Sequence, residues 1–425
     1  MTQSNSTQRV EQALERAVEV ADLNLFAYLD AENALVQAAQ LDRETAQGQW
    51  RGPLHGLPVT IKDLFNVLGM PTRAGAKAKM PPLQPTEATA VARLRAAGAV
   101  ILGKTNMVEI ALGITGENPW TGDVKNPLDP TRQTGGSSSG SAAAVAAGIG
   151  TLSLGTDTAG SIRIPSALCG VVGFKPTFGV VPLDGALPLC WSCDHAGPIT
   201  RTVNEAAMMF EVLAKQPPKL TKLNGTKLRF GVPYHYLEGA LSDEVRQVWE
   251  QFLQTLSAGR ATLVAMDMDD IFKRTIDVFV PLRAESSITH RHALASEPVH
   301  FSPFVHSELE RGMRVTAVDY LDALALQKQL RSEADLALRN VDALILPATP
   351  TIAQPRGSTE ITLESGRTTL RAGFMHLARP FSLLGLPTLS IPFAKIGALP
   401  VGLQIVTPTG TDWHTLSIGK RLEEI

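Results

Sequence analysis

Apolar and polar positions follow two different periods along the chain, and the first sixty residues show both. Residues 8–47 carry apolar side chains at helical spacing among many charges, without an interrupting proline, so we expect two helices there. The segment 56–62 then places β-branched residues after a Gly-Leu-Pro turn. This pattern predicts a short strand that ends on Lys62.

The same alternation continues through the next hundred residues. A helical pattern at 89–97 leads into an apolar strand at 99–102, and a small apolar helix at 141–148 leads into a buried strand at 151–154. Helices that alternate with strands in this way favour an α/β fold.

The middle of the chain is less regular. Residues 179–198 are dense in glycine and proline and predict a loop, whereas 203–213 return to helical spacing. A polar stretch at 219–225 is the best candidate for a boundary, and a strand pattern at 227–232 follows it.

Three strand patterns near the carboxyl terminus suggest that the chain returns to its central sheet. They lie at 343–346, 388–391 and 402–406. We therefore expect one large domain over 1–425, with a mostly helical layer inserted at 219–340 and the strands of 341–425 rejoining the sheet.

Composition narrows the classes of function. The chain has 425 residues and a formal net charge of −2, which offers no basic field for nucleic acid. Residues 1–15 are polar without the pattern of a secretion signal, and the weakly polar stretch 141–155 is too short to span a membrane. Three cysteines are too few for a disulfide framework, so we expect a cytoplasmic protein.

Two glycine- and serine-rich blocks offer candidate chemistry. Hydrolysis of an amide needs an activated nucleophile, a proton carrier and donors aimed at the developing oxyanion. In the block 155–161, Ser161 follows small residues whose backbone N–H groups are accessible, so this loop could wrap a carbonyl oxygen.

The second block, Gly-Gly-Ser-Ser-Ser-Gly-Ser at 135–141, has two alternative interpretations. On composition it could be a flexible link. It also fits the Gly-x-Ser-x-Gly nucleophile elbow, which requires a strand immediately before it. Residues 126–132 do not look like a strand, which argues against the elbow.

Taken together, three blocks resemble the amidase signature family. They are Pro-Val-Thr-Ile-Lys-Asp at 58–63, Gly-Gly-Ser-Ser-Ser-Gly at 135–140 and Gly-Thr-Asp-Thr-Ala-Gly-Ser at 155–161. They occur in the family's order, and flanking segments up to 399–404 agree as well. The resemblance extends from about residue 25 to the carboxyl terminus. It implies the amidase-signature fold, a central twisted mixed β-sheet covered on both faces by helices, with helices at 8–47 and a signature core at 52–215.

The resemblance also implies the catalytic roles. Ser161 would attack the amide carbon, and Ser137, preceded by a cis peptide bond, would relay the proton to Lys62. For this role Lys62 would have to be neutral, which burial away from water can achieve.

Further residues of the two blocks would support these three. The expected oxyanion donors are the backbone N–H groups of Thr158, Ala159, Gly160 and Ser161. The expected supporting residues are Ser138, Asp157 and Arg163. Two positions depart from the family pattern, because Ser139 and Ala159 stand where many members have glycine.

Other candidates carry less weight. His290, His292 and His300 lack the spacing of a metal site, and we expect neither metal nor cofactor. Met107 and the loop 190–194 could line a pocket or could simply pack in the core.

The expected activity is hydrolysis of a small-molecule carboxylic amide to the acid and ammonia. Arg283 or Arg379 could hold a substrate carboxylate. The alternative is the glutaminase component of a tRNA-dependent amidotransferase, and a third reading is a non-catalytic binding protein. We expect no nucleic-acid or membrane partner, and a homodimer is compatible with the sequence.

Overall fold

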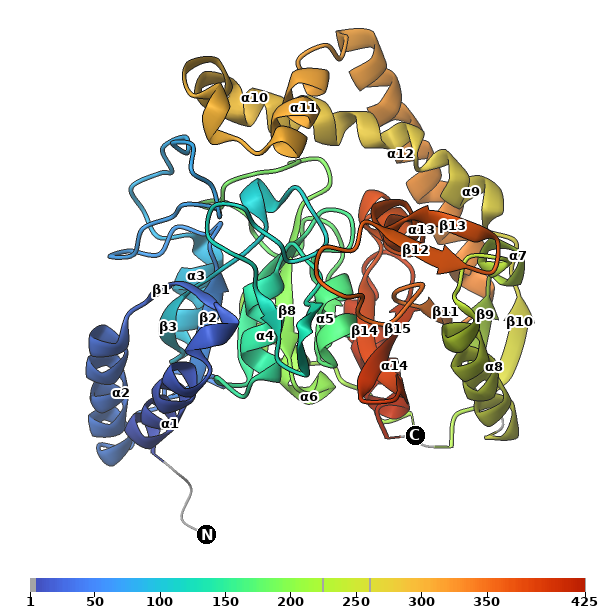
Figure 1. The fold of residues 1–425 in the computed structure, drawn as a ribbon. Helices are drawn as coiled ribbons and strands as arrows, with labels where there is room; N and C mark the ends of the chain where they lie inside the picture. The colour runs from blue at the N-terminus through green and yellow to red at the C-terminus, as the bar shows by residue number, and fades with distance from the viewer. Residues whose placement is uncertain (1–4, 224, 260, 425) are drawn as a thin grey trace.

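The structure is a computed structural model that describes residues 5–223, 225–259 and 261–424. The first four residues of the polar amino-terminal segment, and one residue of the expected boundary at 219–225, lie outside the described residues. Within the described chain, eleven strands form a mixed sheet in the order β1-β3-β2-β6-β8-β7-β14-β15-β11-β9-β10 (Figure 1). The predicted α/β fold with a mixed central sheet is confirmed.

One half of the sheet positions the signature blocks. Its strands are β1 (Phe26–Leu29), β3 (Val100–Thr105), β2 (Pro58–Lys62), β6 (Leu152–Asp157), β8 (His195–Thr200) and β7 (Val172–Lys175). Strand β2 runs parallel to both β3 and β6, so the carboxyl ends of these three strands lie at the same end of the sheet. Lys62 and Asp157, the last residues of β2 and β6, are therefore neighbours.

The other half is built from the later part of the chain. Its strands are β14 (Thr388–Ile396), β15 (Leu399–Val406), β11 (Ala343–Pro347), β9 (Arg229–Val232) and β10 (Thr262–Ala265). The strand patterns at 343–346, 388–391 and 402–406 correspond to β11, β14 and β15.

Helices pack on both faces of the sheet. One face carries α1 (Ser6–Glu19), α2 (Ala31–Ala46), α4 (Ser139–Ala146) and α5 (Arg163–Cys169). The other carries α3 (Thr89–Ala96), α6 (Val203–Ala214), α8 (Asp243–Ala258) and α14 (Asp412–Leu422). Side chains cap several helix starts: the Thr202 hydroxyl accepts from the Glu205 N–H and the Glu205 side chain accepts from the Thr202 N–H, which fixes where α6 begins.

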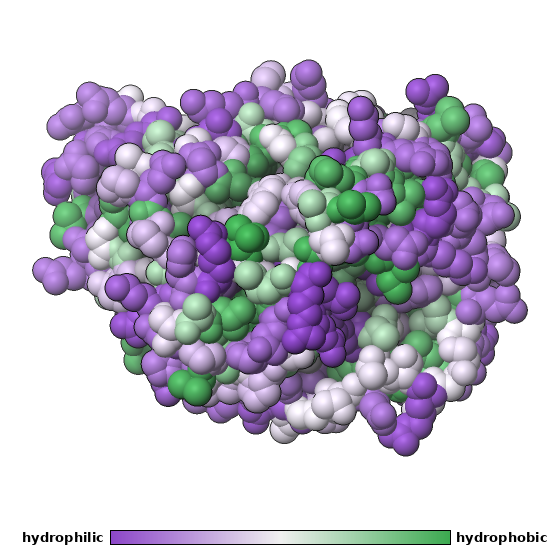
Figure 2. Space-filling model, turned by 90° about the horizontal axis from the view of Figure 1, so that it is seen from above, coloured by the Kyte–Doolittle hydropathy of each residue, from purple (hydrophilic) through white to green (hydrophobic). Residues whose placement is uncertain are grey.

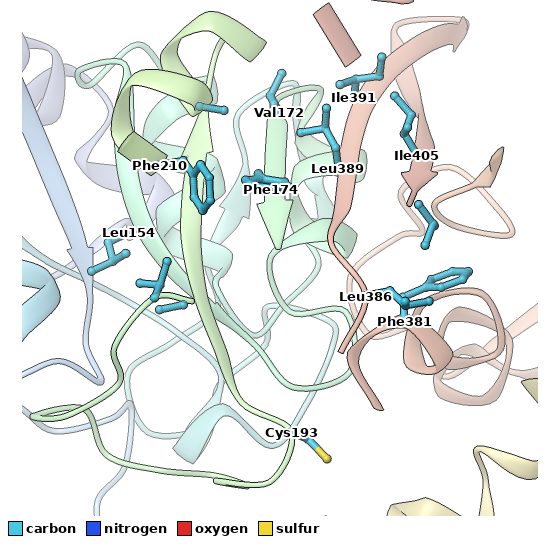
Figure 3. Packing of buried hydrophobic residues seen from close by; sticks show 14 of the residues in the cluster. Leu154, Val172, Phe174, Cys193, Phe210, Phe381, Leu386, Leu389, Ile391 and Ile405 are labelled. Carbon is cyan, nitrogen blue, oxygen red and sulfur yellow. The ribbon is translucent and has the colours of Figure 1, made fainter. Parts of the chain in front are cut away.

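The largest cluster of buried apolar side chains lies between the sheet and the helices α3, α6, α8 and α14. Leu154, Phe174 and Leu389 of β6, β7 and β14 belong to this cluster, and the ring of Phe210 from α6 meets the ring of Phe174 edge-on, with 5.2 Å between the ring centres (Figure 3). Burial of such large apolar side chains is the main stabilising contribution to the fold.

A third group of helices arches over the loops at one end of the sheet (Figure 1). It comprises α9 (Asp269–Arg274), α10 (Val280–Ser296), α11 (Pro303–Gly312) and α12 (Ala317–Ala337). The remaining helices are α7 (Tyr234–Leu237) and α13 (Leu370–Leu383), the latter beside the hairpin of β12 (Glu360–Leu363) and β13 (Gly366–Thr369). Viewed from the side of the arch, hydrophobic side chains form several separate patches among hydrophilic ones (Figure 2).

Two local predictions need correction. The expected loop at 179–198 ends in strand β8, which begins at His195 and tolerates Pro198 opposite Leu154 of β6. The segment 126–132 does contain strand: β4 (Lys125–Asn126) and β5 (Asp129–Gln133) pair as a hairpin outside the central sheet. The Asn126 side-chain amide, which donates to the Gln133 carbonyl, holds this hairpin closed.

The layer at 219–340 is mostly helical, and it also supplies two strands to the main sheet: β9, which corresponds to the strand pattern at 227–232, and β10. None of the helices in the described ranges is both long and apolar enough to cross a membrane.

Candidate active site

Lys62 brings the three signature blocks together. It is the last residue of β2, every residue of which is buried. Its Nζ donates to Ser137 Oγ and to Thr156 Oγ1, each at 2.7 Å. One amine thus contacts a hydroxyl of the 135–141 block and a hydroxyl of the 155–161 block.

The environment of Lys62 favours its neutral form. Burial lowers the pKa of Lys62 to about 7, while the carboxylates of Asp157 and Asp194 oppose that shift. The neighbouring Asp63 does not pair with Lys62, because its carboxylate forms a buried ion pair with Lys104 at 2.9 Å. A large share of Lys62 is therefore uncharged near neutral pH.

Ser137 lies in a tightly packed turn between the β4–β5 hairpin and α4. The Gly136–Ser137 peptide bond is cis, as the family resemblance implied. Gly135 has a φ of 75°, and a side chain there would collide with Pro165. The carbonyl of Ser137 accepts from the N–H of Val108, and its side chain is fully buried.

Ser161 lies on the loop between β6 and α5. Its backbone carbonyl accepts from the N–H of Ser138 at 3.2 Å, which couples the two glycine- and serine-rich blocks. Among the described residues, the hydroxyls of Ser137 and Ser161 do not hydrogen-bond to each other. Lys62 and Ser137 are thus joined by a hydrogen bond that does not extend to the hydroxyl of Ser161.

The backbone N–H groups of this loop fall into two sets: those that donate to Asp157, and those without a partner in the described chain. The N–H groups of Gly160 and Ile162 donate to the two carboxylate oxygens of Asp157, at 2.8 and 3.1 Å. Within the described part of the chain, the N–H groups of Thr158, Ala159 and Ser161 make no hydrogen bond. Three of the four expected oxyanion donors therefore have no partner, whereas the fourth, at Gly160, holds the loop.

Asp157 and Arg163 form a fully buried bidentate pair, with N–O distances of 3.0 and 3.1 Å. Arg163 also donates to Gln404 Oε1 and to Ser382 Oγ. Burial alone would raise the pKa of Asp157, but the charge of Arg163 holds it well below its usual range. This network fixes the loop from behind, in line with the supporting role expected for Asp157 and Arg163.

Ser138 holds strand β6 in place. Its Oγ donates to the Thr156 carbonyl at 3.1 Å and accepts from the Thr156 N–H at 3.3 Å. The hydroxyl of the following Ser139 is buried and, among the described residues, has no hydrogen-bond partner.

Two further residues of the site escaped the sequence analysis. Thr156 contacts Lys62, although the pattern marked it only as part of a block. Asp194 accepts from Thr158 Oγ1 at 2.6 Å and from the backbone N–H of Leu189 and Cys190. Burial raises the pKa of Asp194 to about 6. Its only sequence signal was its place in the loop 190–194.

The remaining candidate residues differ in their burial and in their partners. Met107 is buried in the apolar core, and Trp191 of the loop 190–194 is half exposed. Arg283 is paired with Glu308 at 3.2 Å, while the buried Nε of Arg379 has no hydrogen-bond partner among the described residues. Within the described ranges, no three His, Cys, Asp or Glu residues are grouped to hold a metal ion.

The sequence is similar to those of known amidases and amidotransferase subunits. The sequence profile of the family described as Amidase matches residues 8–416. The glutamyl-tRNA(Gln) amidotransferase A-subunit of Koribacter versatilis (strain Ellin345) is 35% identical, with 91% of this chain and 88% of that protein covered. The AtzE subunit of 1-carboxybiuret hydrolase from Pseudomonas sp. (strain ADP) is 33% identical, with 95% and 91% covered.

Solved structures give the same result. A crystal structure of an amidase is 51% identical with a TM-score of 0.94, covering 99% of this chain and 96% of that one. The native peptide amidase from Stenotrophomonas maltophilia is 28% identical with a TM-score of 0.81, covering 99% and 93%.

Proposed function

Since the chain belongs to the Amidase family, it is an enzyme that hydrolyses amide C–N bonds, and we propose that it converts a small-molecule carboxylic amide to the carboxylate and ammonia. The observation that carries this proposal is the contact of Lys62 Nζ with Ser137 Oγ, in a pocket that lowers the pKa of the lysine to about 7. A neutral amine can accept a proton at physiological pH, whereas a charged one cannot.

In the proposed reaction, Ser161 Oγ attacks the amide carbon. Its proton passes to Ser137 Oγ while the proton of Ser137 passes to Lys62. The negative charge that develops on the carbonyl oxygen is met by the unpartnered N–H groups of the loop 158–161. Removal of one such donor typically raises the barrier by about 3–4 kcal/mol.

Protonated Lys62 then returns its proton through Ser137 to the leaving nitrogen. The C–N bond breaks, ammonia departs, and an acyl ester remains on Ser161. Water attacks this ester with Lys62 and Ser137 again taking the proton, and release of the carboxylate restores the free serine.

The first step requires one adjustment of this geometry. Ser137 and Ser161 lie on adjoining segments but their hydroxyls are not bonded, so a rotation of the Ser161 side chain completes the relay when substrate is present. Such catalytic bonds often tighten only in the complex with substrate.

An ammonia-release screen over short aliphatic, aromatic and dicarboxylic amides tests the activity, with Ser161→Ala as the control. We expect turnover by the wild type and none above background by Ser161→Ala. If Ser161→Ala retains wild-type turnover, the nucleophile has been assigned wrongly.

A second candidate is the glutaminase component of a tRNA-dependent amidotransferase. The similarity to the Koribacter versatilis protein favours it. Ammonia release from glutamine only in the presence of co-purified partner proteins would support this candidate over a free-standing amidase.

A further inference from the structure

A cavity of about 620 Å³ lies between four segments of the chain. They are the loop 108–119 after β3, the start of α11, residues 357–359 before β12, and the start of α13. Its apolar lining includes Leu112, Ile114, Phe304 and Leu370. This is an ordinary size for a pocket that holds a small molecule.

The cavity adjoins the candidate active site. Ile114 belongs to the same buried apolar cluster as Ala159 of the oxyanion loop. A side chain built on Gly136 would meet Val108 and Ile114, two residues of the cavity wall. The wall therefore continues directly into the turn that carries Ser137.

Helix α13 sets the distance between the two sites. Arg371 and Ala378 are seven residues apart and so lie on the same face of the helix. Ala378 packs on Gly160, because a Cβ built there would lie 2.6 Å from the Ala378 Cβ. The start of the Arg371 side chain is thus about 10 Å along the helix from the oxyanion loop.

Arg371 is the only cation among the residues that line the cavity, and within the described chain it has neither an ion pair nor a hydrogen bond. Its guanidinium is half buried and stacks over the ring of Phe304 at 5.1 Å. Burial lowers the pKa of Arg371, with Glu308 opposing this shift and Arg283 adding to it. An anion at this point would offset the cost of burying the guanidinium.

The nearby carboxylates are already occupied. Glu308 is already paired with two other arginines, Arg283 at 3.2 Å and Arg311 at 2.6 Å. Glu109, at the cavity wall, accepts from Trp120 Nε1 and from the Ser302 N–H.

The other two acidic residues of the wall are held in the same way. Glu117 accepts from the Gly357 N–H and Asp123 pairs with Arg356. In the described chain, none of the four acids forms an ion pair with Arg371. The charge of Arg371 is therefore left for a ligand.

We propose that Arg371 binds a carboxylate at the far end of the substrate's acyl chain, while the apolar part of that chain fills the cavity. The preferred substrates are then monoamides of medium-length dicarboxylic acids. This inference rests on the proposed amidase function, because it assigns the specificity of that same site.

The first test compares three amides of matched length: suberic acid monoamide, octanamide and 8-amino-octanamide. The wild type should prefer the monoamide over octanamide. For Arg371→Ala the ratio of kcat/KM between these two should fall about 10- to 100-fold, mainly through KM, which is the size expected for loss of a charged hydrogen-bonded pair. Arg371→Glu should reverse the preference toward 8-amino-octanamide.

Two arginines serve as controls. Arg367→Ala removes an exposed arginine from the neighbouring hairpin and should leave the ratio unchanged. Arg379→Ala tests the competing arginine on the same helix. An unchanged ratio in Arg371→Ala with intact melting behaviour, or a loss found only in Arg379→Ala, would overturn the proposal.

A binding measurement separates this proposal from the proposed function. Calorimetric titration of suberate into Ser161→Ala requires no turnover. We expect binding that the added Arg371→Ala substitution weakens about 10- to 100-fold. If octanamide is hydrolysed in a Ser161-dependent manner but suberate binds both proteins equally, the amidase function stands and the carboxylate site does not. If suberate binding depends on Arg371 while the wild type hydrolyses no amide, the site stands and the proposed function fails.

Discussion

Two lysines on adjacent strands are both fully buried, yet their surroundings differ in kind. Lys104 on β3 faces the carboxylate of Asp63 at 2.9 Å and forms an ion pair. Lys62 on β2 faces two hydroxyls, those of Ser137 and Thr156. Burial lowers the pKa of both amines, but only Lys104 has a directly bound carboxylate that favours its charged form.

The difference teaches that the partner, rather than burial alone, decides what a buried lysine does. An ion pair serves structure, because removing either member leaves an uncompensated charge. A lysine held by hydroxyls can lose and regain a proton, because its partners can pass that proton on. By pairing with Lys104, Asp63 leaves Lys62 free of a bound carboxylate.

The strongest way to break this comparison is to remove the proposed catalytic amine. Lys62→Met should lower kcat/KM roughly 1,000- to 10,000-fold, because the proposed general base is lost. Its melting temperature should fall less than that of Lys104→Met, because two buried hydroxyls lose a partner but no charge is left unpaired. Steady-state ammonia release and calorimetry measure the two effects, and a large fall in stability with modest loss of activity would assign Lys62 a structural role.

The matching substitution at Lys104 should act on stability. Lys104→Met leaves the Asp63 carboxylate buried without its cation, which typically costs about 3–5 kcal/mol. Denaturant unfolding measures this loss. The double variant Lys104→Met, Asp63→Leu should recover much of it, and a double variant as unstable as Lys104→Met would contradict the ion-pair account.

A subtler change sharpens the role of the hydroxyls. Thr156→Val removes one of the two groups bound to Lys62 and should reduce kcat about tenfold, the effect of one buried hydrogen bond. Thr156→Ser keeps the hydroxyl and should restore most of the rate. Equal losses in the two variants would mean that packing of the threonine methyl matters more than its hydroxyl.

The smallest predicted effect is a shift of the pH profile. Asp194 favours the charged form of Lys62, so Asp194→Asn should lower the pKa of Lys62. The acidic limb of the pH profile of kcat/KM should therefore move to lower pH by a fraction of a unit. Any overall loss of activity caused by weakening the hydrogen bond from Thr158 to residue 194 is a separate effect. A limb that moves upward would have the wrong sign for this electrostatic explanation.

Sequence motifs identified the candidate reacting residues but not the side chains that contact them. Lys62, Ser137 and Ser161 stand in continuous sequence blocks, so the family pattern can be recognised from the sequence alone. The contacts of Thr156 and Asp194 depend on strand register and loop closure, which no local pattern records. The same is true of Gln404, which meets Arg163 across 241 positions.

The predicted fold was similarly correct in its elements and less so in their limits. Glycine and proline density concealed the start of β8, because Pro198 can occupy a strand position that needs no donor. The β4–β5 hairpin depends on the Asn126 side chain rather than on apolar alternation. The cavity at Arg371 left no sequence signal, since segments from separate parts of the chain build it.

The most direct test of the central claim is the rate at which a fluorophosphonate labels Ser161 as pH is varied. Lys62 must be neutral to take the proton, so labelling of the wild type should rise with pH through an inflection near 7 and then level off. In Lys62→Met the rate should be low and should lack that inflection. A wild-type profile that keeps rising toward a pH of about 10, where an unperturbed lysine titrates, or an inflection near 7 that survives in Lys62→Met, would contradict the account.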